Sequence, residues 1–439
     1  MKTCSKLYIL LFVLFSGTLI PTRVYSQNFQ AAAVKKDITS ESSKYLLGYG
    51  PRKSTGVHDR IYHRIVALND GQSHFYLISS ELGLISPSLY DRVADLLEEK
   101  YDIQPSNFWW SVTHTHSAPE VGPPGLPAVF SSLSERYDHS IDTTYTNKVV
   151  NKLVEGIEEA KSELQPAQLG VGWGYSQANI NRRARDADGS IFLGMNPDGP
   201  IDRRIGILKI TKESDNSLLT LIANYPIHGT VMGPGNTLIS GDAPGIVSKY
   251  LEKELGAPIL FINGAAGNIA PIYSVYPSPQ AGHLSQFKVM LGDKIIKAQQ
   301  QIATETNEVT LNFGKLMLRT PRREELGWPS DLYDYSYENN ANQNMIKLPI
   351  QFLKINEDIA IWNAPLELFC ELSNEIREKS PFPYTFYYGY TNGWLGYMPT
   401  KQAFEYGGYE PSVSPYIPSA GRELIKAVSA YLRGELKSK

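Results

Sequence analysis

The chain carries an apolar, aromatic run that ends in a pair of histidines, Phe108-Trp109-Trp110-Ser111-Val112-Thr113-His114-Thr115-His116. A short run of aromatic and apolar residues predicts a buried strand, and the polar residues after it mark the point where the chain turns. Side chains two positions apart on a strand project from the same face, so we expect His114 and His116 to reach one pocket. Neutral imidazole is a common zinc ligand. Alone, such a pair is a weak signal for a metal.

Apolar strands that end in polar residues alternate with amphipathic helices along the chain. The expected helices span residues 86–101, 145–164, 244–255, 284–304, 366–379 and 420–436. The expected strands span residues 64–68, 74–79, 107–112, 167–175, 218–225, 258–262, 309–318, 346–353 and 359–363, the first two joined as a hairpin. This alternation predicts an α/β fold, with mixed β-sheets layered with α-helices in a single large catalytic domain. The polar residues 319–344 are expected to cross the surface as an irregular excursion.

The first 26 residues are interpreted as a secretory signal peptide. Two lysines lie in residues 1–6, residues 7–15 are apolar, and Val24-Tyr25-Ser26 offers a cleavage position. The apolar segment is too short to span a membrane comfortably. We therefore expect a mature domain of residues 27–439 that is secreted or periplasmic. Cys370 is then its single cysteine, so the mature chain is expected to contain no internal disulfide.

The composition and charge argue against some classes of binding partner, but they do not decide the activity. The formal net charge is -3 for the full sequence, and it becomes about -6 once the signal peptide with its three basic residues is removed. No basic cluster is present that would favour nucleic acid or an anionic lipid surface. The chain has 27 tyrosines, 28 prolines and 35 glycines, which suits loop-rich α/β enzymes and carbohydrate-binding proteins equally.

Further polar residues lie at the ends of predicted strands, where clefts form in layered folds. The candidates beyond the histidine pair are His228, Glu367, Tyr397 and Tyr409. Each has an ordinary structural alternative. His228 could satisfy a buried carbonyl, Glu367 could stabilise the start of a helix, and the tyrosines could be half-buried aromatics with hydrated hydroxyls.

Several motifs in a fixed order make the chain resemble the neutral, non-lysosomal ceramidase family. They are Thr-His-Thr-His-Ser at 113–117, Ile-His-Gly-Thr at 227–230, Gly-Ala-Ala-Gly-Asn-Ile-Ala-Pro at 264–271, Pro-Leu-Glu at 365–367, Gly-Tyr-Met-Pro-Thr at 396–400 and Gly-Gly-Tyr-Glu at 407–410. The openings at residues 33–39 and 56–59 resemble the family as well. The resemblance covers nearly the whole predicted mature chain.

The resemblance implies a catalytic Zn²⁺ held by four side chains. Carried over motif by motif, the implied ligands are His114, His228, Glu367 and Tyr397. Two imidazoles and a carboxylate are usual donors to catalytic zinc and leave a position open for water.

The resemblance also implies roles for residues beside the metal. His116 is expected to act as an acid/base or oxyanion donor, and Arg182 and Tyr409 to point at the substrate carbonyl. Asp242 is a candidate partner for a ligand imidazole.

The chain departs from the family pattern at two places. Where ceramidases carry Gly-Asp-Val-Ser-Pro-Asn with an active-site serine, this chain has Ala270 for the serine and Asn268 for the aspartate. A serine-dependent amidase mechanism is therefore excluded at this position, whereas zinc-assisted attack by water is not. The family's C-terminal immunoglobulin-like domain has no counterpart after Tyr409, which weakens the expectation that ceramide is the substrate.

Three hypotheses about function remain. The first is a zinc hydrolase that attacks the amide of ceramide or another N-acyl lipid. The second is a zinc hydrolase of the same fold that acts on a glycan or glycoconjugate, favoured by Ala270 and by the tryptophans at 109, 110, 173, 328 and 394. The third is a binding protein that has lost catalysis. The sequence leaves the oligomeric state open.

Overall fold

The structure, a computed structural model, describes residues 29–129, 140–272 and 282–436. The predicted signal peptide at residues 1–26 lies outside the described residues and stays a prediction. None of the described helices combines the length and the apolar character that crossing a bilayer requires.

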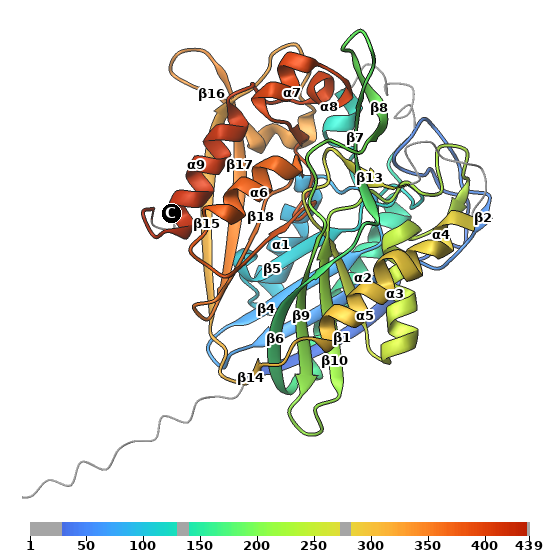
Figure 1. The fold of residues 1–439 in the computed structure, drawn as a ribbon, viewed down its shortest axis with the longest axis vertical. Coiled ribbons are helices and arrows are strands. Elements are labelled where there is room, and N and C mark those ends of the chain that lie inside the picture. Colours follow the sequence, from blue (N-terminus) through green and yellow to red (C-terminus); the bar gives the residue numbers. More distant parts are fainter. Residues whose placement is uncertain (1–28, 130–139, 273–281, 437–439) are drawn as a thin grey trace, which may run out of the picture.

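A mixed nine-stranded sheet forms the centre of the molecule, with the strand order β12-β10-β9-β6-β1-β3-β4-β5 and with β14 paired to β6 (Figure 1). Its strands are β1 (Gln30–Asp37), β3 (Tyr62–Asn69), β4 (His74–Ser80), β5 (Phe108–Val112), β6 (Gln165–Tyr175), β9 (Arg204–Lys212), β10 (Leu218–Tyr225), β12 (Ile259–Asn263) and β14 (Glu305–Thr306). The pairs β4–β5 and β10–β12 are parallel, whereas the other neighbours are antiparallel.

The two edge strands of this sheet approach each other. Its halves are joined only where Gln30 and Ala31 of β1 pair with β6, so the halves fold over one another. Leu260 and Ile262 of β12 share a core with Trp109 of β5. The carboxyl ends of β5, β10 and β12 therefore meet on one side of the molecule, although β5 and β12 are opposite edges of the same sheet.

A second sheet of five strands packs beside the first, with the order β15-β17-β18-β20 and β16 paired to β17. Its strands are β15 (Leu311–Pro321), β16 (Ser336–Glu338), β17 (Asn344–Ile355), β18 (Ile359–Asn363) and β20 (Tyr384–Tyr388). Short pairings complete the fold: β2 (Gly56–Val57) with β11 (Leu238–Ile239), β13 (Ile269–Pro271) with β7 (Asn179–Arg185) and β8 (Ile191–Asn196), and β19 (Glu367–Leu368) with β21 (Tyr397–Met398).

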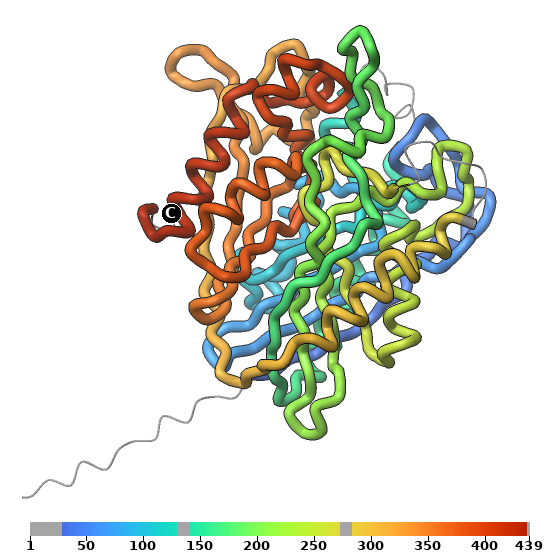
Figure 2. Tube along the Cα trace, viewed as in Figure 1, coloured from blue at the N-terminus to red at the C-terminus, as the bar shows by residue number. Residues whose placement is uncertain are grey.

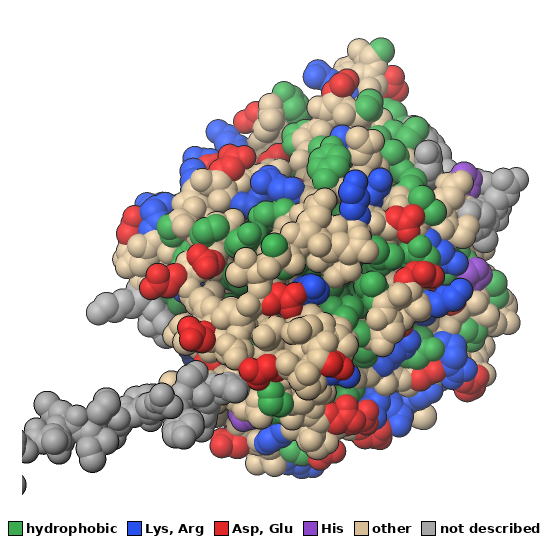
Figure 3. Space-filling model, turned by 60° about the horizontal axis from the view of Figure 1, so that its bottom comes forward, with side chains coloured by type: hydrophobic (Ala, Val, Ile, Leu, Met, Phe, Trp, Pro, Cys, Tyr) green, Lys and Arg blue, Asp and Glu red, His purple; other side chains and the backbone are tan. Residues whose placement is uncertain are grey.

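Helices cover the sheets, as the tube in Figure 2 shows most clearly for α6 and α9 over the second sheet and for α3 and α5 over the first. They are α1 (Pro87–Tyr101), α2 (Thr143–Ser162), α3 (Asp242–Leu255), α4 (Gly282–Phe287), α5 (Asp293–Gln300), α6 (Cys370–Glu378), α7 (Lys401–Tyr406), α8 (Tyr409–Val413) and α9 (Ala420–Leu432). Helix α1 begins with Pro87 in its first turn, where no backbone donor is needed, and buries Leu89, Val93 and Leu97 on one face. On the face seen in Figure 3, acidic and basic side chains are interspersed.

The structure confirms the predicted class of mixed sheets layered with helices in one domain, including the β3–β4 hairpin. One local prediction is wrong and another is confirmed only in part. The helix expected at 366–379 begins only at Cys370, because Glu367 and Leu368 pair with β21 instead. The segment 319–344 lies mostly at the surface as expected, but it is not irregular throughout, because it extends β15 and forms β16. Cys370 is buried and is not in a disulfide.

Candidate metal centre

The two histidine motifs are held together by their backbones beyond the ends of β5 and β10. The His116 N–H donates to the Gly229 carbonyl at 2.8 Å, and the Gly229 N–H donates to the His114 carbonyl at 3.2 Å. A Cβ at Gly229 would lie 2.6 Å from the Thr115 Cα, so only glycine permits this approach. The histidine that precedes Gly229, His228, is thereby brought beside His114 and His116.

The predicted reason for the His114–His116 proximity is wrong, although the proximity itself is observed. β5 ends at Val112, and His114 adopts a left-handed backbone conformation with φ of 59°. The two side chains therefore do not share a strand face. They converge across a turn, with the Nε2 atoms 3.2 Å apart. Together with His228 they form a group whose ligand nitrogens all lie within 4.8 Å of one another.

Backbone carbonyls fix the tautomers of two of these imidazoles. His114 donates its Nδ1–H to the Gly83 carbonyl at 3.0 Å, and His228 donates its Nδ1–H to the Ile269 carbonyl at 2.8 Å. A carbonyl can only accept, so in both rings Nε2 keeps its lone pair. Burial lowers the pKa of His114 to about 4 and lowers that of His228 well below its usual range, so both rings are neutral near pH 7. Metal-binding histidines are oriented in this way.

Glu367 adds a carboxylate to the imidazoles. It is 2% exposed, and its Oε2 lies 3.1 Å from the His228 Nε2, while its Oε1 lies 3.7 Å from the His114 Nε2. The β19–β21 pairing sets Glu367 directly opposite Tyr397. This short parallel pairing explains how two residues that are 30 positions apart in the sequence face one centre.

Two aromatic residues that sequence reasoning did not assign to the centre hold the Glu367 carboxylate. Trp394 donates its indole N–H to Oε1 at 3.0 Å, and Tyr390 donates its hydroxyl to Oε2 at 3.2 Å. The Tyr390 ring also stacks on His114, with 4.4 Å between ring centroids. The sequence pointed to Trp394 as one of the tryptophans that favour a glycan substrate, and it gave Tyr390 no role.

Arg182 connects Tyr397 and His228 to a buried acid. Its guanidinium donates to the Tyr397 hydroxyl at 3.2 Å, to the His228 Nε2 at 2.9 Å and to the Glu410 carboxylate at 2.9 Å. Burial raises the pKa of Tyr397 well above its usual range, and the nearby Glu367 carboxylate adds to the shift. Arg183 also binds Glu410.

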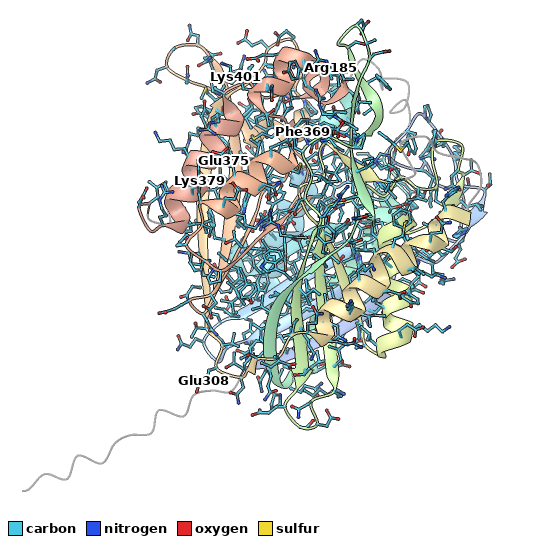
Figure 4. The ribbon with its side chains drawn as sticks, in the orientation of Figure 1. Arg185, Glu308, Phe369, Glu375, Lys379 and Lys401 are labelled. Carbon is cyan, nitrogen blue, oxygen red and sulfur yellow. The ribbon has the colours of Figure 1, made fainter. Side chains whose placement is uncertain are left out.

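The outer side of the centre is formed by α8 and β7. Tyr409 is 39% exposed and packs edge-on against Tyr397, with ring centroids 5.8 Å apart. Arg183 lies 5.4 Å from the ring centroid of Phe369. Phe369, labelled in Figure 4, directly precedes α6. Tyr409 therefore lies between Tyr397 and solvent.

A loop near residues 45–53, which the sequence did not connect to the site, packs on His116. Gly48 has φ of 112°, and a Cβ there would lie 2.3 Å from the His116 Cγ, so the imidazole takes the place of a side chain. The Tyr49 ring meets His116 edge-on at 4.9 Å, and Arg52 donates to the His116 carbonyl at 2.7 Å. The two glycines of Gly48-Tyr49-Gly50 are the feature of the sequence that could have identified this loop as part of the site.

The donor set suits a zinc-type ion. The His114 and His228 Nε2 lone pairs and the Glu367 oxygens are all electron-pair donors that lie close together, and the His228 Nε2 also accepts a hydrogen bond from Arg182. Neutral imidazole nitrogens with a carboxylate are the usual ligands of catalytic zinc. The Tyr397 hydroxyl is a further oxygen donor opposite Glu367. The residues present therefore fit the metal that the sequence motifs imply.

The structure gives Asp242 a role other than the expected one. The Asp242 carboxylate accepts from the backbone N–H groups of Val231, Met232 and Ala243, so it shapes the loop after His228 rather than orienting an imidazole. Ala270 is buried in β13, next to the Ile269 carbonyl that binds His228. The position of the family serine is thus close to the centre, but it offers no hydroxyl.

Comparisons with known proteins agree with the motifs. The sequence profile described as neutral/alkaline non-lysosomal ceramidase, N-terminal, matches residues 29–267, which include His114, His116, Arg182 and His228. The neutral ceramidase of Pseudomonas aeruginosa is 28% identical over 274 residues, 59% of this chain and 39% of that protein. The neutral ceramidase of Mycobacterium tuberculosis is 28% identical over 238 residues, 50% of this chain and 35% of that protein.

These matches cover less than half the length of the two relatives. The fold extends further than the sequence match. The crystal structure of neutral ceramidase from Pseudomonas aeruginosa superimposes with a TM-score of 0.76 at 22% identity, covering 94% of this chain and 75% of that one. Glu367, Tyr397 and Tyr409 lie beyond the profile match. Because the profile spans more than half of the chain, the chain belongs to the neutral/alkaline non-lysosomal ceramidase family.

Proposed function

We propose that this protein is a zinc-dependent hydrolase that cleaves the amide of an N-acyl lipid of the ceramide type. The observation that carries the proposal is the convergence of the His114 and His228 Nε2 atoms on the Glu367 carboxylate, at 3.7 Å and 3.1 Å. Membership of the family and the names of its relatives support an amide substrate.

His114, His228, Glu367 and Tyr397 would hold the metal. When bound, zinc lowers the pKa of a coordinated water toward about 7 and polarises the carbonyl that is attacked. Glu367 is kept in orientation by Trp394 and Tyr390, so it can serve as a ligand without reorganisation. Tyr397, hydrogen-bonded to Arg182, faces Glu367 across the centre.

Three further residues would act in amide hydrolysis, by proton transfer and by stabilising the oxyanion. His116 has its Nε2 beside that of His114, so it is placed to take the proton of the attacking water and to deliver it to the departing nitrogen. The amide C–N bond breaks, and a carboxylic acid and an amine are released. Arg182 and Tyr409 supply positive charge and a hydroxyl toward the oxyanion, and each such donor is typically worth about 3 kcal/mol.

The described residues also line a cavity that none of the candidate metal ligands borders. It has a volume of about 440 Å³, and its lining includes Leu47 and Leu84, which are neighbours of the glycines that contact His116 and His114. Ile85 and Val121 are apolar parts of the wall, whereas Lys53 is charged.

The experiment that tests the proposal measures hydrolysis of a fluorescent ceramide together with zinc content. We expect activity that a chelator abolishes and that zinc restores. Activity that resists the chelator would contradict the role of zinc. Activity on a glycan panel with none on ceramide would contradict the substrate.

The second candidate is a zinc hydrolase of the same fold that acts on a glycan or glycoconjugate. It is favoured by Ala270, since ceramidases carry a serine there. Support from tryptophan is reduced, because Trp109, Trp110 and Trp394 are at most 3% exposed and cannot stack on a sugar. Restoring the hydroxyl with Ala270→Ser separates the candidates: a large rise in ceramide hydrolysis favours the lipid amidase.

We further propose that the protein is secreted or periplasmic. Residues 1–26 support this proposal through their two lysines, short apolar segment and cleavage position. N-terminal sequencing of protein recovered from the medium or periplasm should begin near Gln27, whereas intact Met1 in the cytoplasm would contradict the proposal.

A further inference from the structure

Asn263, the last residue of β12, is completely buried at the point where the histidine-bearing segments meet. In the sequence, Asn263 follows directly after the predicted strand 258–262, and no role was assigned to it. A fully buried amide with no exposure must have its donors and acceptor satisfied by the protein. The hydrogen-bond partners of the Asn263 amide are unusual, because they belong to the segments that carry the candidate metal ligands.

The Asn263 side chain joins the residues that immediately precede His114 and His228. Its Oδ1 accepts the Ile227 N–H at 2.9 Å, and its Nδ2 donates to the Ile227 carbonyl at 2.7 Å. The same Nδ2 donates to the Thr113 carbonyl at 3.3 Å. Since β5 and β10 are not neighbours in the sheet, this amide is a direct link between the two strand ends.

The Asn263 backbone reaches the third segment of the centre. Its carbonyl accepts the Gly389 N–H at 2.9 Å. Gly389 precedes Tyr390, which stacks on His114 and donates to Glu367. One buried residue thus contacts the chain just before His114, just before His228 and just before the residue that holds the carboxylate.

We infer that Asn263 is a positioning residue of the metal centre, which sets the separation of the His114 and His228 imidazoles. Metal ligands must be held within about 0.5 Å of the productive geometry, and rigid hydrogen bonds behind the ligands provide that precision. The Gly229 hydrogen bonds join the same segments on the other side of the histidines. Loss of the amide should therefore loosen the site without separating the histidines completely. The inference rests on the proposed zinc binding.

The test compares zinc affinity in two variants. Asn263→Ala removes all three side-chain hydrogen bonds, whereas Asn263→Asp keeps the size and the acceptor for the Ile227 N–H but loses both donations. We expect both to bind zinc at least about tenfold more weakly than the wild type, the range typical of groups that orient metal ligands. The rise in melting temperature on adding zinc should shrink, and the absorption bands of the Co²⁺-substituted protein should shift.

Asn356→Ala is the matched control. Asn356 also links two segments through its side chain, accepting the Thr310 N–H at 2.8 Å and donating to the Glu308 carbonyl at 2.9 Å. It lies at the turn between β17 and β18, at the end of β18 away from Glu367. This variant should lower the melting temperature with and without zinc equally, and leave zinc affinity and the Co²⁺ spectrum unchanged.

Folded Asn263 variants with wild-type zinc affinity and Co²⁺ spectrum would overturn the inference. If Asn263→Ala does not fold, the zinc affinity of Asn263→Asp provides the test, because this variant creates no cavity. A wild-type protein that binds no zinc would defeat the proposed function as well, whereas a zinc-binding wild type with unaffected variants defeats only this inference.

Discussion

Two buried histidines, His63 and His114, look alike by every local measure. They are 0% and 2% exposed, and burial lowers the pKa of each to about 4. Each donates one ring N–H to a backbone carbonyl at 3.0 Å, His63 to Val149 and His114 to Gly83. Burial, pKa and one hydrogen bond therefore do not distinguish a structural histidine from a metal ligand.

The second ring nitrogen distinguishes them. His63 accepts the Ser80 hydroxyl at 2.6 Å, and Ser80 in turn accepts the Trp110 indole N–H at 2.8 Å, so that network is complete. The second nitrogen of His114 instead faces the His116 Nε2 at 3.2 Å and the Glu367 carboxylate at 3.7 Å. A buried histidine is thus a candidate ligand when its remaining lone pair meets other electron-pair donors.

The largest effect should come from removing His114. His114→Ala deletes one of the two imidazoles that face Glu367, so we expect zinc binding and hydrolysis to be lost together. Elemental analysis and a ceramide assay check this. Retention of one zinc per chain would show that the ligand assignment is wrong.

His63→Gln is the contrasting variant for the same pair of measurements. It disturbs the Ser80 and Val149 partners and should cost about 1–3 kcal/mol of stability, while zinc content stays at the wild-type level. Loss of zinc from His63→Gln would contradict the assignment of His63 as a structural histidine and of His114 as a metal ligand.

Glu367→Gln should have the next largest effect. The amide keeps an oxygen for Trp394 or Tyr390 but removes the negative charge between the imidazoles. We expect zinc affinity to fall by more than the about 100-fold that groups outside the ligand set can contribute. Competition with a chromophoric chelator measures it, and a smaller loss would place Glu367 outside the ligand set.

The sequence predicted those parts of the site that follow from strand ends. β5 and β10 were recognised from their apolar runs, and with them the positions of His114 and His228. The family motifs added Glu367, Tyr397, Arg182 and Tyr409, which lie around the same centre, while their catalytic roles stay predictions.

Long-range backbone pairing could not be predicted. Glu367 precedes a true helical pattern, so local preference extended the helix over it, yet two residue pairs with β21 override that preference. The support from Tyr390 and Asn263 was missed for the same reason. Their roles depend on contacts with segments more than a hundred residues away, and a single buried tyrosine or asparagine carries no periodic signal.

Lowering the pH should reduce the contribution of His63 to the free energy of unfolding. The difference in that free energy between wild type and His63→Gln should therefore become smaller. In the unfolded chain a histidine takes its proton near pH 6.5, whereas folded His63 stays neutral down to about pH 4. The unfolded state therefore binds more protons within this window, and stability falls as the pH decreases, by at most about 1.4 kcal/mol per pH unit for one group. Above pH 6.5 the contribution is constant.

Urea unfolding of wild type and His63→Gln across this window measures the effect. Comparing the two proteins removes the contributions of Asp91 and Asp242, whose pKa values burial raises to about 6 and which act in the opposite direction. The wild-type advantage should shrink from pH 6.5 to pH 4. A constant or growing advantage would contradict a neutral buried His63.

The smallest effect should come from Tyr390→Phe, which keeps the ring that stacks on His114 and removes only the hydroxyl that donates to Glu367 at 3.2 Å. Trp394 still holds the other carboxylate oxygen, so zinc affinity should fall by only about tenfold, the low end of the range for groups that orient metal ligands. Tyr76→Phe is the control, because the Tyr76 hydroxyl is buried without a hydrogen-bond partner among the described residues. Its zinc affinity should equal that of the wild type. Equal affinities in all three proteins would show that the Tyr390 hydroxyl does not contribute to orienting Glu367 for the metal.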